Sequence, residues 1–372
     1  MGWRLEDGRK KFYGTARMQD ATHSFWWHYL RQLDDPRARA GMVMDDQLSK
    51  LGWVPTRSNC GELEEAIEIL LASMQKPYRA VLEGIFVARA MSGDVNAEAR
   101  HSAGSAYVVL PVQYTFAAEA YLAAWHRLLA AEASGEVTGD AIGAVMDDLE
   151  RHRLQWASSA VIQPAPPEAR KGPFEDTQYI ETLSAVDRWI MAHEWSHHLL
   201  GHEAKGVKKL RLTARVEQFI DAVGGGVVLR GRPYSQLKEF HADILGTALL
   251  AGELDESPAS PARVFQAVLG GVIALIVEAH VNNTWIVEAD SSHPPTLQRL
   301  RLLLRWVNER YGALTLESRR LDGMCRSLVR FASISAQTAV YREGDDVGPR
   351  PSWAFAIEDA HDLTPRLRFW AN

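Results

Sequence analysis

Cysteine is scarce in this sequence, which has only two among its 372 residues, Cys60 and Cys325. The two lie far apart and form no CxxC pair, so the sequence predicts neither a disulfide framework nor a zinc site made of thiolates. The first residues, MGWRLEDGRKKFYG, are not followed by an apolar run of signal-peptide length. These absences favour a reducing compartment, and we expect a cytoplasmic protein.

Long hydrophobic runs and an excess of positive charge are also missing. The longest apolar run, AVLGGVIALIV at 267–277, has 11 residues, whereas a helix needs about 20 to cross a bilayer. This run therefore predicts a buried helix, and no membrane segment is expected. The net charge of −6 gives no overall field that would attract nucleic acid. Membrane and nucleic-acid partners are thus disfavoured.

What is present is the composition of a folded protein, with 47% hydrophobic and 24% charged residues. Apolar residues recur every three or four positions, which is typical of amphipathic helices. The predicted helices lie within 61–90, with a break near Pro77, and within 117–133, 139–161, 179–202, 236–254 and 262–281. One segment, 106–116, favours a strand at a sheet edge because it contains Pro111. The expected fold class is mainly α (α+β), with room for a small edge sheet.

Residues 191–203, MAHEWSHHLLGHE, contain four histidines, and five of these residues, His193-Glu194-Trp195-Ser196-His197, fit the pattern HExxH. On a helix, histidines four residues apart lie about 5–6 Å apart on one face and can bind one ion. Glu194 lies about 100° round the helix from His193, where it can reach a water molecule as a general base. The alternative is a helix end with a polar, solvated face.

The other two histidines of this stretch are not expected to bind the same ion. His198 lies about 100° round from His197, and His202 points away from it if the helix persists. Both are expected to be surface or packing histidines. A third histidine ligand of the HExxHxxGxxH type is also excluded, because the chain has Leu200 and Glu203 at the glycine and histidine positions.

A second predicted helix offers a carboxylate ligand instead. Glu239 and Asp243 lie four residues apart, 42 residues after His197, and share one helix face. By itself this spacing is common on helices, and the role of third metal ligand for Glu239 is what the family resemblance described below implies. Asp243 is expected to accept the second ring N–H of His193 or His197, which fixes the tautomer of a ligating histidine.

Three further residues are candidates near the site. His293, in SHPPTLQRL at 292–300, either donates a hydrogen bond to a developing oxyanion or merely packs at the start of a helix. Tyr234, just before Glu239, is another candidate oxyanion donor. Arg299 has three alternatives: it pairs with a carboxylate near the site, binds a substrate carboxylate, or is an ordinary exposed arginine.

In type and order, the three motifs HEWSHHLLGH, EFHAD and SHPPTLQRL resemble those of gluzincin endopeptidases. That group includes the heat-shock-associated and CaaX-prenyl proteases and the phage-exclusion peptidase Lit, and the resemblance covers about residues 184–305. Because the membrane proteases of the group have transmembrane helices and this chain shows none, a soluble relative nearer to Lit is the better comparison.

The resemblance implies a zincin-like core in which His193, His197 and Glu239 bind Zn²⁺ and Asp243 supports a ligating histidine. It also implies hydrolysis of peptide bonds in a protein substrate by a zinc-activated water, with Glu194 as general base and His293 assisting. A regulated or phage-defence role is a further expectation. The alternative is a non-catalytic helical regulatory or interaction protein with a vestigial or structural zinc site, closed by His202 or Glu203.

The expected organisation has three parts. Residues 1–165 form a mainly helical N-terminal region for substrate recognition, regulation or core extension, and its aromatic stretch Phe25-Trp26-Trp27 packs in the core or forms an interface patch. Residues 166–310 form the peptidase core, and 311–372 a C-terminal extension. A proline-rich linker at 163–176 and a basic, glycine-rich loop at 203–238 are predicted within this plan. A protein or peptide substrate and a regulatory partner are the expected partners.

Overall fold

The computed structural model describes eight continuous segments and scattered residues within 43–50, 144–151 and 293–303. The segments are 3–16, 24–32, 56–91, 96–102, 104–135, 177–202, 233–256 and 260–282. The predicted linker at 163–176, most of the predicted loop at 203–238, and the predicted extension at 311–372 lie outside these residues. Cys325 and Glu203 lie outside them as well.

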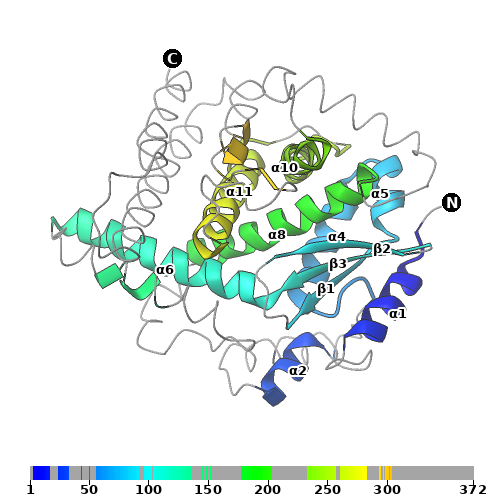
Figure 1. The fold of residues 1–372 in the computed structure, drawn as a ribbon, viewed down its shortest axis with the longest axis horizontal. Coiled ribbons are helices and arrows are strands. Elements are labelled where there is room, and N and C mark those ends of the chain that lie inside the picture. Colours follow the sequence, from blue (N-terminus) through cyan, green and yellow to red (C-terminus); the bar gives the residue numbers. More distant parts are fainter. Residues whose placement is uncertain are drawn as a thin grey trace.

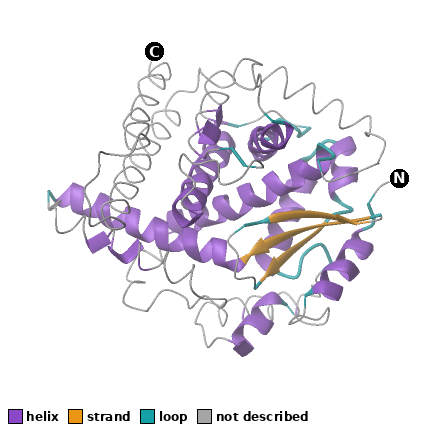
Figure 2. Ribbon diagram, viewed as in Figure 1, coloured by secondary structure: helices purple, strands orange, loops and turns teal. Residues whose placement is uncertain are grey.

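A three-stranded sheet is formed by β1 (Phe86–Ala90), β2 (Glu98–Ser102) and β3 (Ser105–Pro111), in the order β1-β3-β2 (Figure 2). β1 runs parallel to β3, and β2 runs antiparallel to it. The strand that contains Pro111 is therefore the middle strand, and its predicted place at the edge is wrong. The proline is tolerated because it is the last residue of β3, and the pairing with β2 ends at Val109.

The segment 61–90 also differs in part from its predicted helices. Helices α4 (Gly61–Ser73) and α5 (Lys76–Leu82) confirm the break near Pro77, which lies in the first turn of α5. The last five residues form β1 instead of a helix. Because Phe86 and Val87 suit a strand as well as a buried helix, pairing with β3 decides their structure.

The two faces of the sheet pack against different layers. Helix α1 (Leu5–Thr15) covers one face, where Phe12 packs against Phe86, Ala88 and Tyr107. Alternate residues, including Val87, Val108 and Leu110, point into the main hydrophobic core on the other face. This alternation follows from the two-residue period of a β-strand.

Four long helices build the rest of the core: α6 (Val112–Ser134), α8 (Thr177–Leu199), α10 (Tyr234–Ala251) and α11 (Pro261–Asn282). Helix α8 lies centrally, between the sheet and the pair α10 and α11 (Figure 1), and it contacts all of them. Helices predicted at 117–133, 179–202, 236–254 and 262–281 are thus confirmed. Phe25 and Trp26, in α2 (Phe25–Gln32), are buried in the same core, as the packing alternative predicted.

Glycines bring α8 close to its neighbours. A Cβ atom on Gly246 of α10 would lie 2.9 Å from the backbone N of His193, and one on Gly270 of α11 would lie 2.4 Å from the carbonyl O of Ala185. Real Cβ atoms do not approach that closely, so both crossings depend on glycine. The crossing at Gly246 lies at the first histidine of the HExxH motif.

Helix α11 contains the longest apolar run of the sequence. By length and composition alone it could cross a membrane, but 78% of its most apolar 18-residue window is buried inside the protein. Among the described residues it is the only helix that passes this test. Its burial against α8 and α10 is that of a core helix, as the sequence predicted.

Candidate metal centre

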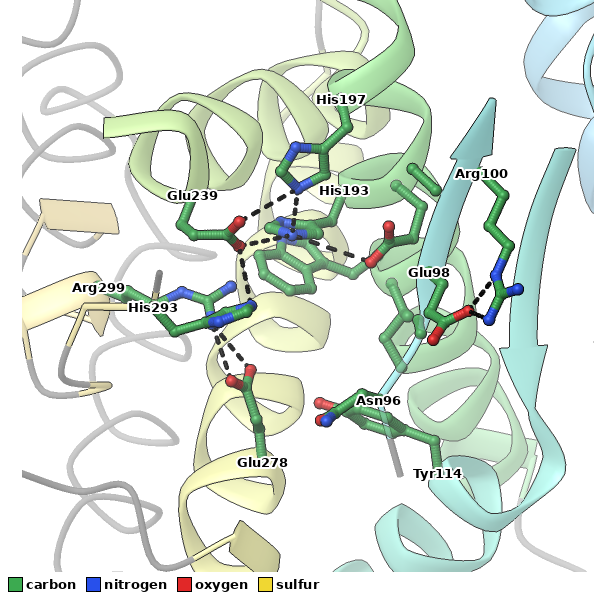
Figure 3. Close-up of a pocket in the computed structure, with 15 residues that line it drawn as sticks. Asn96, Glu98, Arg100, Tyr114, His193, His197, Glu239, Glu278, His293 and Arg299 are labelled. Carbon is green, nitrogen blue, oxygen red and sulfur yellow. Dashed lines mark hydrogen bonds and ion pairs between the residues drawn. The ribbon is translucent and has the colours of Figure 1, made fainter. Parts of the chain in front are cut away.

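Helices α8 and α10 bring together the three residues predicted to bind a metal. Figure 3 shows His193, His197 and Glu239 pointing toward one another, and their ligand atoms all lie within 4.8 Å of one another. The two Nε2 atoms are 3.1 Å apart. Glu239 places Oε2 at 3.4 Å from Nε2 of His193 and Oε1 at 3.7 Å from Nε2 of His197.

These separations fit a small metal ion. Ligand atoms at 2.0–2.1 Å from a tetrahedral ion lie about 3.3 Å from each other, and the three observed separations, 3.1, 3.4 and 3.7 Å, bracket that distance. Both histidines are buried and Glu239 is nearly so. Two imidazoles and one carboxylate in this arrangement can hold a metal ion.

Asp243 lies behind the first ligand, as the sequence predicted. Its Oδ1 is 2.9 Å from Nδ1 of His193, on the side of the ring away from the ligand cluster. The ring of Trp189 stacks on the same imidazole. Arg299 binds Asp243 through two 2.8 Å hydrogen bonds and also binds Glu278 at 2.9 and 3.0 Å. Of the three alternatives for Arg299, pairing with a carboxylate near the site is the one observed.

Glu194 lies beside the metal ligands without belonging to their cluster. Its Oε1 is 4.0 Å from Nε2 of His193, and its carboxylate accepts a hydrogen bond from the backbone N–H of Ala99 in β2. Burial raises the pKa of Glu194 to about 7 in the metal-free protein; the charge of Glu239 acts in the same direction, and His193 acts against it. A carboxylate with such a pKa can both take up and release a proton near neutral pH.

The pKa of the candidate ligand Glu239 is shifted in the opposite direction from that of Glu194. Burial acts to raise the pKa of Glu239, but the hydrogen bond and charge of His193, together with the charge of Arg299, outweigh it and hold the pKa well below its ordinary value. Glu239 is therefore ionised at neutral pH. Burial also lowers the pKa of His197 to about 3, so this ring is neutral. For His193 burial acts to lower the pKa, but the hydrogen bonds and charges of Asp243 and Glu239 outweigh it and raise the pKa to about 10, so a metal ion that binds here displaces a proton from this ring.

The remaining histidines of the motif have different roles. His198 is buried with its Nε2 3.4 Å from the carbonyl O of Tyr107, which confirms it as a packing residue between α8 and the sheet. His202 does not point away from the site. Because α8 ends at Leu199, the chain turns back, and Nδ1 of His202 lies 2.9 Å from Nδ1 of His197. The expectation for His202 assumed a continuing helix and is corrected.

The two candidate oxyanion donors lie in different surroundings. His293 is at the site: its Nε2 is 3.9 Å from Oε2 of Glu239, and its side chain is 51% exposed. Tyr234 is the first residue of α10, 64% exposed, and it is not among the residues that line the cavity at the site. Its ring lies beside the ammonium group of Lys238 instead. The placement leaves His293 as the candidate and gives Tyr234 no support.

A cavity of about 500 Å³ opens beside the ligands. Its walls include residues that sequence reasoning did not connect with the site: the stretch 96–100, Tyr114 and Glu278. The first of these leads into β2 and includes its first three residues, and Tyr114 lies in the first turn of α6, so both come from the N-terminal region. No local pattern marks them, because their place at the cavity depends on how the sheet packs against α8.

Comparisons with protein-family models, with curated proteins and with solved structures give no match to this chain. The protein is mainly helical with a small three-stranded sheet.

Proposed function

We propose that this protein is a zinc-dependent endopeptidase that cleaves peptide bonds in a protein substrate. The observation that carries the proposal is the position of Glu194, buried on the cavity wall next to His193, His197 and Glu239 but outside their ligand cluster. A site that only held a metal ion for stability would have no need of this fourth group. Zinc is the metal that a set of two histidines and one glutamate favours in hydrolases.

The residues of the chain divide the chemistry among them. A bound zinc ion supplies Lewis-acid catalysis and lowers the pKa of water. Glu194 accepts the proton of the attacking water and passes it to the amide nitrogen as the peptide bond breaks. His293, at the mouth of the cavity, donates a hydrogen bond to the oxygen of the carbonyl under attack. Asp243 and Trp189 keep the ring of His193 in place.

The cavity wall favours an extended peptide as substrate. Residues 97–99 at the start of β2 line the cavity, and within the described residues β2 pairs with β3 along one edge only. The other edge can accept backbone hydrogen bonds from an added strand, which is a common way to bind an extended chain. A peptide bound there passes directly by Glu194, whose carboxylate is hydrogen-bonded to Ala99.

The alternative is a regulatory protein with a vestigial or structural zinc site, and a structural site is more often closed by a fourth protein ligand. The predicted candidate His202 contacts Nδ1 of His197, whereas the other ligands face Nε2 of that ring. The two nitrogens of one imidazole ring cannot both face the same ion. His202, which lies at Nδ1 of His197, is therefore not placed to be the fourth ligand of an ion at Nε2, and it gives a structural zinc site no support. A cytoplasmic location, a regulatory partner and a phage-defence role are part of the proposal and rest on the sequence alone.

The variant Glu194→Gln tests the proposal. Zinc-loaded wild-type protein is incubated with a cell lysate, and new peptide termini are identified by mass spectrometry. We expect termini that appear with wild type and with the control Glu65→Gln, which changes an exposed carboxylate on α4, but not with Glu194→Gln. The inactive variant should still bind zinc, because Glu194 is not a ligand. Equal cleavage by wild type and Glu194→Gln would contradict the mechanism.

A further inference from the structure

The last turn of α8 has a specific geometry that its sequence explains. Gly201 has a φ of +65°, in the left-handed region that glycine favours, and it donates its N–H to the carbonyl O of His198 at 3.1 Å. His202 donates its N–H to the carbonyl O of His197 at 2.9 Å. These two bonds form a Schellman motif, in which the residue after the glycine lies against the third residue from the end of the helix.

That motif normally joins two apolar side chains, but here it joins two histidines. The Nδ1 atoms of His197 and His202 are 2.9 Å apart and both rings are buried. The turn is also tied to the ligand-bearing helix α10, because Lys238 donates its Nζ to the carbonyl O of His202 at 2.8 Å. On the outer side, the ring of His241 stacks on that of His202. The backbone of His202 is therefore held by Lys238, and its ring by His197 and His241.

Only one of the two Nδ1 atoms can carry the proton between them. Nε2 of His197 faces His193 and Glu239, so this is the atom that must have a free lone pair to bind a metal ion. A neutral imidazole that binds through Nε2 carries its proton on Nδ1. Consequently Nδ1 of His197 is the donor and Nδ1 of His202 is the acceptor.

We propose that His202 is a positioning residue that accepts the Nδ1 proton of His197 and so presents the unprotonated Nε2 of His197 to the metal. This inference rests on the metal centre of the proposed function. It gives each ligating histidine its own acceptor, Asp243 for His193 and His202 for His197. Groups of this kind orient the imidazole and raise its basicity, which strengthens metal binding.

Two substitutions of similar shape separate hydrogen bonding from packing. Asparagine at 202 places an oxygen where the histidine has Nδ1, two bonds from Cβ, whereas leucine places a methyl group there. We measure the dissociation constant of zinc in the full-length protein by competition with a chromophoric chelator, for wild type, His202→Asn and His202→Leu. Circular dichroism confirms that each variant is folded, and His202→Ala replaces His202→Leu if the latter is not. The control is His198→Asn, which changes the neighbouring buried histidine that contacts the sheet.

We expect His202→Leu to weaken zinc binding by about 10–100-fold and His202→Asn to stay within about threefold of wild type. The visible spectrum of the cobalt(II)-substituted protein should change in His202→Leu and be preserved in His202→Asn. The inference is overturned if His202→Leu binds zinc like wild type. It is also overturned if His202→Asn binds as weakly as His202→Leu, or if His198→Asn has the same effect.

The measurement also separates this inference from the proposed function. If the wild type binds zinc and the leucine and asparagine variants differ as expected, the role of His202 is supported. If the same wild-type protein produces no new termini, the peptidase activity is contradicted while the role of His202 stands. Wild-type protein that binds no zinc overturns both.

Discussion

Arg299 holds the carboxylate of Asp243 through two hydrogen bonds of 2.8 Å, from Nε to Oδ2 and from Nη2 to Oδ1. The side chains are only 3% and 2% exposed, so both charges have lost their water. A charge buried in this way is tolerated only while its partner is present. Because Asp243 also lies 2.9 Å from His193, the same pair connects the stability of the core with the orientation of a candidate metal ligand.

The variant Arg299→Met should therefore be strongly destabilised. It leaves Asp243 and the partly buried Glu278 without their guanidinium, which should lower the free energy of unfolding by about 3–5 kcal/mol. Urea unfolding followed by circular dichroism measures the loss. The double variant Arg299→Met with Asp243→Leu should recover part of it, because no lone charge at 243 is left. Arg100→Met, at an arginine on the exposed rim of the cavity, serves as control, and equal stabilities of Arg299→Met and this control would refute the prediction.

Removal of the metal should abolish activity without unfolding the protein. The three ligands lie on two helices that pack in a large core, unlike those of small zinc domains that fold only with metal. We expect the far-ultraviolet circular dichroism to be unchanged after dialysis against a chelator. Added zinc should then stabilise the folded protein and raise its unfolding midpoint. At a free zinc concentration 100 times the dissociation constant, the gain in the free energy of unfolding should be about 2.7 kcal/mol. Loss of helical signal in the chelated protein would contradict this expectation.

The substitution Gly246→Ala should disturb the site from a distance. Its new Cβ would lie 2.9 Å from the backbone N of His193 and 3.0 Å from the carbonyl carbon of Ala192, so α10 must move away from α8. Overpacking of this kind costs about 1–3 kcal/mol, and the shift of Glu239 should also weaken zinc binding. The matched control is Gly14→Ala in α1, where a Cβ meets nothing within 4 Å. Chemical unfolding and chelator competition test both variants; unchanged zinc affinity in Gly246→Ala would count against the proposed coupling.

The thiol of Cys60 should resist alkylation in the folded protein. Burial raises its pKa well above the ordinary value, and the nearby charge of Glu62 acts in the same direction. A raised pKa leaves the thiol protonated at pH 8, and the side chain is fully buried, so both reactivity and access are low. Iodoacetamide treatment with and without urea, followed by peptide mass spectrometry, should detect modification of Cys60 in urea only. Modification at equal rates in both conditions would disprove the prediction.

The helices and the geometry of the metal ligands could be predicted because their signals are local. Residues four apart on a helix share a face whatever the rest of the protein does, so spacing alone predicts His193 and His197, whereas Glu239 and Asp243 needed the family resemblance as well. The close approach of α8 and α10 then follows from the apolar residues of each helix and from Gly246.

The strand at 106–116 and a small sheet could be predicted, but the order of the strands and the cavity wall could not, because they depend on contacts between distant segments. Strand β2, with the sequence EARHS, has no apolar alternation, and its structure comes from pairing with β3. Glu278 has no local signal either, because its place at the site depends on its partner Arg299, 21 residues later. The position of His202 is partly predictable from local sequence. A glycine such as Gly201 is typical of a helix end, and a Schellman turn at that glycine accounts for the contact of His202 with His197.

The close crossing of α8 and α10 also bears on which ions the site accepts. Helix packing holds the three ligand atoms at 3.1 to 3.7 Å from one another, a spacing that suits a small ion better than a large one. Calcium requires six to eight oxygen ligands at about 2.3–2.6 Å, and magnesium requires an octahedron of oxygen atoms. Two imidazole nitrogens and one carboxylate suit zinc and its transition-metal neighbours instead. We therefore expect a centre that binds zinc much more tightly than calcium or magnesium, with a selectivity set by the distance between α8 and α10.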